Sequence, residues 1–296
     1  MSSVSAREVA RCTPPLEARD GKLTLRDREL TYLEWGSGNA ETIVLVHGIL
    51  AQALIWESVA QALVELGFRV VAPDLRGHGL STHNALGDGY NLLGFASDLK
   101  ALVEHLELER FVLAGHSLGS VVAVFYTACI GSGVTSLALI ETLLLGALDT
   151  VDLRALLAQD LGHMATTHRH QPIPTLEAAA TLLRQSNRGL SPAFASKLCA
   201  RGTRREGDAL IWRWDPILRT RVGLRFPGSR AQYMDLLRQI SLPVRLLFGR
   251  DSHFNRGDEK AQLLTAFPNA VSRTVDGGHN LHVDSPRSVA EELLSL

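Results

Sequence analysis

Five short runs of the sequence are predominantly apolar and show no alternation between apolar and polar residues. Runs of this length, rich in leucine and β-branched residues, are typical of strands that are covered on both faces, as in a parallel sheet. A sheet of this kind needs helices on both sides, which restricts the fold class strongly. The five runs are 42–48 (TIVLVHG), 68–74 (FRVVAPD), 110–117 (RFVLAGHS), 136–141 (SLALIE) and 243–249 (PVRLLFG).

Stretches with helical character separate these runs, and several of them end at a glycine, which commonly stops a helix. Strand and helix therefore alternate along the chain. This order predicts an α/β fold with a mostly parallel central sheet and helices on both faces. The predicted helices are 56–67, 95–108, 118–131, 259–267 and a closing helix at 285–294.

The two ends of the sheet-forming region differ from this pattern. Residues 1–20 are polar and contain the pair Pro14 and Pro15, so we predict a flexible N-terminal leader. Residues 22–36 (KLTLRDRELTYLEWG) alternate between apolar and polar across a turn, which predicts an antiparallel hairpin.

The alternation of strands and helices stops after residue 141. From 142 to 240 the sequence is mainly helical, and no core-type strand returns before 243–249. We predict a helical cap at 142–240, inserted into a core made of 21–141 and 241–296. Its predicted helices are 151–164, 175–187, 191–202 and 231–240.

Composition excludes several classes of protein. The 296 residues are 46% hydrophobic and carry a formal net charge of -1, which suits one large core and gives no reason to expect a nucleic-acid partner. The first residues have no apolar run of the secretory kind, and no stretch reaches the roughly 18 apolar residues of a membrane helix. Cys12, Cys129 and Cys199 stand far apart, as free thiols of a cytoplasmic protein would.

A candidate nucleophile lies where one predicted strand meets the next helix. Gly115 to Gly119 reads G-H-S-L-G, between the strand 110–117 and the helix 118–131. A G-x-S-x-G sequence in this context holds its serine on a sharp turn with the hydroxyl exposed. Ser117 is therefore the predicted nucleophile, and acylation would require donors for an oxyanion. The backbone N–H of Leu118 is one candidate, and that of Ile49, just after the strand that ends in His47 and Gly48, is the second.

Taken together, these motifs resemble the α/β-hydrolase superfamily from about residue 21 to the end of the chain. The matching pieces occur in the family's order: His47-Gly48, 73–81 (PDLRGHGLS), GHSLG and 277–286 (GGHNLHVDSP), with 212–216 (WRWDP) similar to capped members. The resemblance implies acyl transfer through a serine. A serine nucleophile also excludes the dehalogenase and epoxide-hydrolase branches, whose chemistry needs an aspartate.

The general base is predicted to be His279, because serine at its ordinary pKa is a poor nucleophile and needs a base beside it. His279 lies in a glycine-rich loop after the last strand-like run, 271–275, and the order nucleophile, acid, base is that of the family. His282, three residues later, is interpreted as packing against the loop. His163, His168 and His170 are interpreted as solvated polar residues, so no metal and no organic cofactor is expected.

Two carboxylates compete for the role of the acid that orients the histidine. Most of the superfamily takes it from a G-x-x-D sequence after the strand at 243–249, but here Ser252 occupies that place and Asp251 comes one residue early. Glu141 ends the strand after the nucleophile's helix, at the sheet edge where such active sites gather. Certain polyketide-type thioesterases look similar in taking their acid from this position. Glu141 is favoured, and Asp251 stays open.

The cap adds a hint about the substrate. Residues 142–240 contain thirteen arginines and one lysine against eight acidic residues, a formal charge of +6, while the whole chain is -1. A basic lid would attract an anionic substrate, such as an acyl group linked to coenzyme A or to a carrier protein. The leading hypothesis is a thioesterase. A carboxylesterase or lactonase with Asp251 as acid is the alternative, and a ligand-binding receptor on this scaffold is another.

Overall fold

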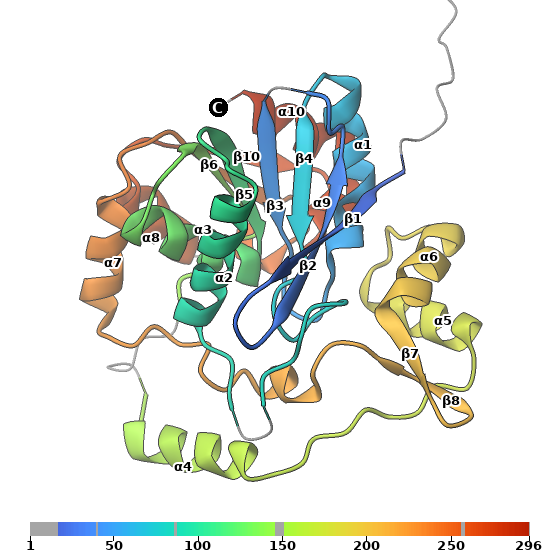
Figure 1. Cartoon of the computed structure of the whole chain (residues 1–296). Helices are drawn as coiled ribbons and strands as arrows, with labels where there is room; N and C mark the ends of the chain where they lie inside the picture. Colours follow the sequence, from blue (N-terminus) through green and yellow to red (C-terminus); the bar gives the residue numbers. More distant parts are fainter. Residues whose placement is uncertain (1–16, 40, 86–87, 146–150, 256–257, 296) are drawn as a thin grey trace, which may run out of the picture.

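A central sheet with helices on both faces organises the chain in the computed structural model, which describes residues 17–39, 41–85, 88–145, 151–255 and 258–295 (Figure 1). Over these residues the main sheet has eight strands in the order β1-β2-β4-β3-β5-β6-β9-β10. All neighbouring pairs from β4 to β10 are parallel, which confirms the predicted α/β class. Its strands are β1 (Arg19–Thr24), β2 (Glu29–Trp35), β3 (Thr42–Val46), β4 (Arg69–Pro73), β5 (Phe111–His116), β6 (Val134–Ile140), β9 (Val244–Gly249) and β10 (Ala270–Val275).

The five apolar runs of the sequence form β3, β4, β5, β6 and β9, as predicted. Their side chains alternate between two separate hydrophobic layers. In β3, Val44 and Val46 belong to one layer while Ile43 and Leu45 belong to the other, and all four are fully buried. Both faces are covered, so most side chains of these strands are apolar on either face, which is why these runs show no alternation.

The predicted core helices cover these two layers. Helices α2, α3 and α8 contribute to the layer that contains Val44, and α1 and α10 contribute to the layer that contains Ile43. They are α1 (Glu57–Glu65), α2 (Leu92–His105), α3 (Leu118–Cys129), α8 (Asp258–Ala266) and α10 (Pro286–Leu294), with the short helices η1 (Ala53–Trp56), η4 (His253–Asn255) and α9 (Leu281–Asp284) in the loops between. Among the described helices we find no candidate for a membrane-spanning segment.

The predicted hairpin is formed by β1 and β2, which pair antiparallel from Arg19 opposite Glu34 to Thr24 opposite Glu29. Residues 1–16 of the predicted leader lie outside the described residues. Arg19 and Asp20, which the prediction placed in the flexible leader, belong to β1 instead.

Between β6 and β9 the chain forms the four helices expected there and one feature that was not expected. A two-stranded antiparallel hairpin, β7 (Thr203–Glu206) and β8 (Ala209–Trp212), follows α6, so the segment is not purely helical. In Figure 1 most of this segment lies at the lower end of the sheet, where the parallel strands end. Its helices are α4 (Leu153–Met164), α5 (Leu176–Ser186), α6 (Pro192–Gly202), η3 (Pro216–Thr220) and α7 (Arg230–Arg238).

Two ion pairs fasten α6 to the core. Arg201 lies against the buried carboxylate of Asp74, with Nη2 2.7 Å from Oδ2, and Lys197 pairs with Glu57 at the start of α1 at 2.5 Å. Burial acts to raise the pKa of Asp74, but the Arg201 guanidinium overcomes that effect and the pKa lies below its ordinary value. The ionised carboxylate and its partner therefore hold this part of the predicted cap in a fixed place over the sheet.

Candidate active site

A large cavity lies between the carboxyl ends of the parallel strands and the segment 142–240. Its volume is about 1100 Å³, and Ser117, Leu118, Ile49 and His279 all line it. Four of the sequence-predicted site residues therefore meet at one cavity, at the strand edge where ligands of open α/β sheets bind. Glu141 does not line it, because it is completely buried behind His279.

Ser117 occupies a sharp turn between β5 and α3. Its backbone angles are φ 51 and ψ -115, a conformation that costs a non-glycine residue about 1–3 kcal/mol. The flanking glycines are needed for space: a Cβ on Gly115 would lie 2.2 Å from the carbonyl oxygen of Gly119, and one on Gly119 would lie 2.2 Å from that of Val46. The G-x-S-x-G sequence thus permits the turn that exposes the serine.

Two backbone N–H groups beside Ser117 are available to a ligand. Neither the N–H of Ile49 nor that of Leu118 donates a hydrogen bond to any part of the chain that the structure describes. The loop with Ile49 lies close to the serine, since a Cβ on Gly48 would be 3.3 Å from that of Ser117. They are the two N–H groups that the sequence predicts as oxyanion donors.

His47 orients the peptide group that carries the Ile49 N–H. Its Nε2 accepts a hydrogen bond from the Leu75 N–H at 3.0 Å, so its Nδ1 carries the proton and donates to the Gly48 carbonyl at 2.7 Å. Burial lowers the pKa of His47, which keeps the ring neutral and this donor pattern intact. The C=O and N–H of one peptide point in opposite directions, so holding the Gly48 carbonyl directs the Ile49 N–H away from His47.

His279 and Glu141 are brought together across 138 residues of sequence. Nδ1 of His279 lies 3.0 Å from Oε2 of Glu141. A carboxylate accepts hydrogen bonds and cannot donate, so Nδ1 carries the proton and Nε2 is left as an acceptor. This is the tautomer that a histidine needs in order to take a proton from a serine.

The Glu141 carboxylate is held by further donors. Oε1 accepts the Gly249 N–H at 2.6 Å, and Oε2 accepts the Ser252 hydroxyl in addition to His279. Ser252 is itself buried, and it occupies the position at which most of the superfamily carries its aspartate. The side chain at the position of the usual acid therefore supports the Glu141 carboxylate, which follows the neighbouring strand β6. The sequence analysis noted this departure from the motif but missed the supporting role of Ser252.

Asp251, the alternative acid, is exposed, and its backbone N–H donates to the Gly277 carbonyl at 3.0 Å. No contact between its side chain and His279 occurs in the described part of the chain. Its one-residue offset from the usual position directs it to solvent, whereas Ser252 points inward.

Two further histidines, His116 and His282, pack close to His279. The ring of His116 packs 4.7 Å from that of His279 and 4.3 Å from that of His282, and its Nε2–H donates to the His279 carbonyl at 2.8 Å. Burial lowers the pKa of His116 well below its ordinary value and that of His282 to about 3, so both rings stay neutral. His282 is buried and packs on Trp56 as well, in accord with its interpretation as a packing residue.

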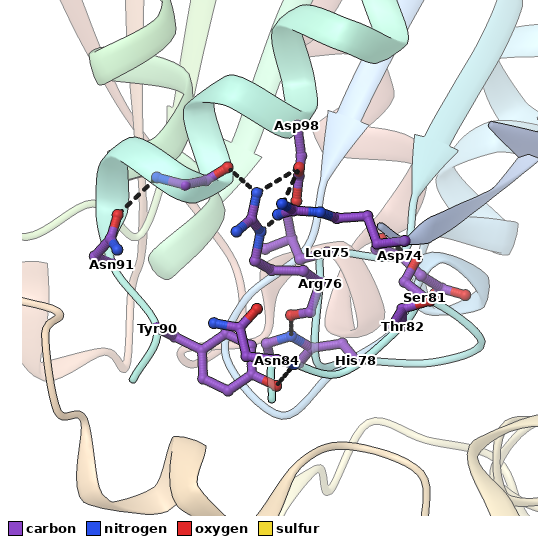
Figure 2. Close-up of polar contacts among 12 residues, drawn as sticks. Asp74, Leu75, Arg76, His78, Ser81, Thr82, Asn84, Tyr90, Asn91 and Asp98 are labelled. Atoms are coloured by element: carbon purple, nitrogen blue, oxygen red, sulfur yellow. Dashed lines mark hydrogen bonds and ion pairs between the residues drawn. The ribbon is translucent and has the colours of Figure 1, made fainter. Parts of the chain in front are cut away.

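The motif from Pro73 to Ser81 supports the loop with Ile49, and its Gly79 also lines the cavity. Figure 2 shows Arg76 reaching Asp98 on α2, with Nε 2.5 Å from Oδ2, while the Arg76 carbonyl accepts from His78 Nδ1 at 3.0 Å. Asp74 accepts the Ala53 N–H at 2.7 Å. The motif therefore ties α2, β4 and the turn after β3 into one unit.

Two histidines of the predicted cap hydrogen-bond to backbone carbonyls. Nε2 of His168 bonds to the His163 carbonyl and Nε2 of His170 to the Trp214 carbonyl, at 2.9 and 2.7 Å. Within the described residues no group of three or more His, Cys, Asp or Glu side chains could hold a metal ion.

Three arginines of the predicted cap border the cavity from η3 and the loop after it. Arg219, Arg221 and Arg225 are exposed, and none of their side chains has a hydrogen-bond or ion-pair partner in the part of the chain that is described. Arg201, by contrast, is neutralised by Asp74. Part of the positive charge of the segment therefore lies at the cavity, which Asp160 also lines.

Comparison with known proteins places these observations in context. Residues 41–286 match the family model for the alpha/beta hydrolase fold. The serine hydrolase-like protein of Danio rerio is 24% identical over 97% of this chain and 90% of its own. The non-heme haloperoxidase of Rhodococcus erythropolis is 39% identical over a shorter part, 36% of this chain and 37% of its own.

Two solved structures are similar over nearly their whole length. A thioesterase domain from the curacin biosynthetic pathway is 32% identical, with a TM-score of 0.89, over 94% of this chain and 99% of that domain. A hypothetical protein from Pseudomonas aeruginosa PAO1 is 27% identical, with a TM-score of 0.80, over 93% of this chain and 96% of that one.

Proposed function

The chain belongs to the alpha/beta hydrolase fold family, and from this premise we propose that it is a serine hydrolase acting on acyl esters or thioesters. Ser117 is the nucleophile, His279 the general base and Glu141 the acid. The observation that carries the proposal is the bond from His279 Nδ1–H to the completely buried Glu141 carboxylate, with Ser117 and His279 on one cavity.

The reaction proceeds through an acyl-serine. His279 Nε2 takes the Ser117 proton as Oγ attacks the acyl carbonyl, and the resulting oxyanion accepts the N–H groups of Ile49 and Leu118. His279 then gives the proton to the leaving thiol or alcohol. A water molecule, deprotonated by the same histidine, attacks the acyl-serine and releases the acid. Throughout, the negative charge of Glu141 stabilises the imidazolium that forms on His279.

A thioesterase is the preferred member of this class. Two features support it: the acid follows β6 rather than β9, and a thioesterase domain is among the similar structures. A carboxylesterase or a lactonase is the alternative, since the same machinery cleaves oxygen esters. A ligand-binding receptor that retains the triad is the alternative outside enzymology.

A single-turnover assay separates these possibilities. We expect thioesters and p-nitrophenyl esters with matched acyl chains to yield the same acyl-Ser117, detectable by mass spectrometry, so that only the acylation rates can differ between the two series. Faster acylation by the thioesters would support the thioesterase. Faster acylation by the oxygen esters would support the esterase. Tight binding of a small molecule without any acylation would overturn the enzyme proposal in favour of a receptor.

The substrate is proposed to carry an anionic group, as coenzyme A esters and acyl chains on phosphopantetheine carriers do. Arg219, Arg221 and Arg225 line the cavity without partners of their own. A guanidinium binds phosphate oxygens with two parallel hydrogen bonds, so such a cluster suits a phosphorylated carrier. The predicted cap, 142–240, would then act as the lid that recognises the leaving group.

Neutralising this cluster is expected to discriminate between charged and uncharged leaving groups. The triple variant Arg219→Gln, Arg221→Gln, Arg225→Gln should raise KM for an acyl-coenzyme A by roughly tenfold or more, because charge-assisted hydrogen bonds are lost. KM for the same acyl group on uncharged N-acetylcysteamine should stay the same. Arg205→Gln, an exposed change on β7 outside the cavity lining, is the control. An equal rise of KM for both substrates would contradict anion recognition.

The cytoplasm is the proposed compartment. Cys129 and Cys199 are both free thiols, and Cys12 lies outside the described residues. Unpaired cysteines are typical of proteins in a reducing environment.

A further inference from the structure

We infer that the hydroxyls of Ser120 and Thr142 form a positioning pair that locks the nucleophile to the strand end carrying the acid. The inference rests on the proposed function, because it assigns these hydroxyls a purpose only if Ser117 and Glu141 act in one reaction. Neither residue lines the cavity. Ser120 is completely buried and Thr142 is 2% exposed, so both lie behind the reacting groups.

The backbone of Ser117 is held at both of its polar groups. Its N–H donates to the Ile140 carbonyl at 3.0 Å. Its carbonyl accepts the Ser120 hydroxyl, with Oγ 2.5 Å away, and also the Ser120 N–H at 3.0 Å. The conformation of Ser117 is strained, and a strained residue persists only where its surroundings hold it from several sides.

The Ser120 hydroxyl is in turn held by Thr142. The two hydroxyl oxygens lie 2.8 Å apart. Ser120 is the donor in both contacts, and a hydroxyl has one proton, so this proton lies between the Ser117 carbonyl and the Thr142 hydroxyl, which both accept. These hydrogen bonds link Thr142, the residue just after Glu141, to the carbonyl of Ser117.

Three consecutive residues at the end of β6 therefore serve one site. Ile140 holds the Ser117 N–H, Glu141 holds the His279 ring, and Thr142 holds the Ser117 carbonyl through Ser120. Glu141, like Ser117, has a positive φ, at 52. That backbone turn lets its side chain and that of Thr142 face different partners. While these hydrogen bonds are intact, Ser117 and Glu141 cannot shift independently of one another.

Catalytic groups must be held to within about half an ångström of their productive geometry, so removing a hydroxyl of the positioning pair is expected to slow the chemical step. Thr142→Val, which removes the hydroxyl but keeps the branched shape, should lower kcat by roughly ten- to a hundredfold with KM unchanged. Ser120→Ala should do the same. The kcat of the double variant should be no lower than that of the slower single variant, because both changes break the same chain of hydrogen bonds. Thr142→Ser, which restores the hydroxyl, should recover most of the loss.

Thr127→Val is the matched control, since Thr127 lies on the same helix as Ser120 and its buried hydroxyl has no partner within the described residues. Rates are normalised to the Ser117 that a fluorophosphonate probe titrates, so unfolded protein is not counted. A kcat for Thr142→Val equal to that of Thr127→Val, or no recovery in Thr142→Ser, would overturn the positioning pair alone. Absence of Ser117 labelling in the unaltered protein would overturn the proposed function and the inference together.

Discussion

Replacing Ser117 by alanine is expected to lower kcat by about 10⁵- to 10⁶-fold, the range reached when a serine hydrolase loses its nucleophile. The acyl-enzyme cannot form without Oγ, and only the oxyanion donors and substrate binding remain to favour attack by water. KM should change little, because the hydroxyl contributes chemistry rather than binding. Steady-state hydrolysis of the best acyl substrate, together with fluorophosphonate labelling, measures both effects.

The control for this variant is Ser132→Ala, an exposed serine in the turn before β6. It should keep full activity and full labelling. Retention of more than about one per cent of the activity in Ser117→Ala would contradict the nucleophile assignment, since catalysis by the remaining groups is far weaker than that. Thermal unfolding of both variants checks the fold. Ser117→Ala should unfold at or slightly above the temperature of the unaltered protein, because alanine leaves no polar group unpaired there.

Replacing Glu141 by glutamine is expected to lower kcat by about 10⁴-fold, as loss of the orienting carboxylate does in serine proteases. The physical reason lies in the donors around Glu141. Oε1 faces the Gly249 N–H, while Oε2 faces both Ser252 and His279. A glutamine amide has one NH₂ group, which must then confront a donor in either orientation. If it faces His279, the ring must turn to the tautomer that protonates Nε2, and that tautomer cannot accept the Ser117 proton.

Asp251→Asn is the matched control, because it makes the same chemical change in the competing carboxylate. Asp251 is exposed, so this variant should stay within about twofold of the unaltered kcat. Glu141→Gln should also unfold more easily, because a buried donor left unpaired costs about 1–3 kcal/mol. Full activity in Glu141→Gln with loss in Asp251→Asn would transfer the acid to Asp251 and remove one of the two supports for a thioesterase.

The sequence predicted the strands and helices of the core because its signals are local. Buried parallel strands need an apolar side chain at nearly every position, and no other element has that demand over so few residues. The β7–β8 hairpin was missed because its signals are not local. Its strands are four residues long and each has only one buried residue, and part of its support is the distant bridge between Ile173 and Leu210. A strand that is stabilised by residues far away in the chain is hard to predict from its own residues.

Ser117 and His279 could also be predicted from sequence to meet at one site, because each belongs to a short motif whose glycines make the local backbone possible. Gly115 and Gly119 leave no doubt that the turn at Ser117 is tight, since any side chain there would meet backbone atoms. The acid could only be narrowed to Glu141 or Asp251. Both follow strands that end at the same edge of the sheet, and sequence order does not say which side chain turns inward.

The kind of fold and the sheet edge at which Ser117 and His279 lie could be read from the sequence alone, since both follow from periodicity and from glycine positions. Which carboxylate meets the histidine became clear only in the folded chain. That choice depends on the pairing of β6 with β9, which sets Glu141 beside the Gly249 N–H and the Ser252 hydroxyl. A buried carboxylate is tolerated only where donors from other elements surround it, and such donors come together only when the sheet is formed.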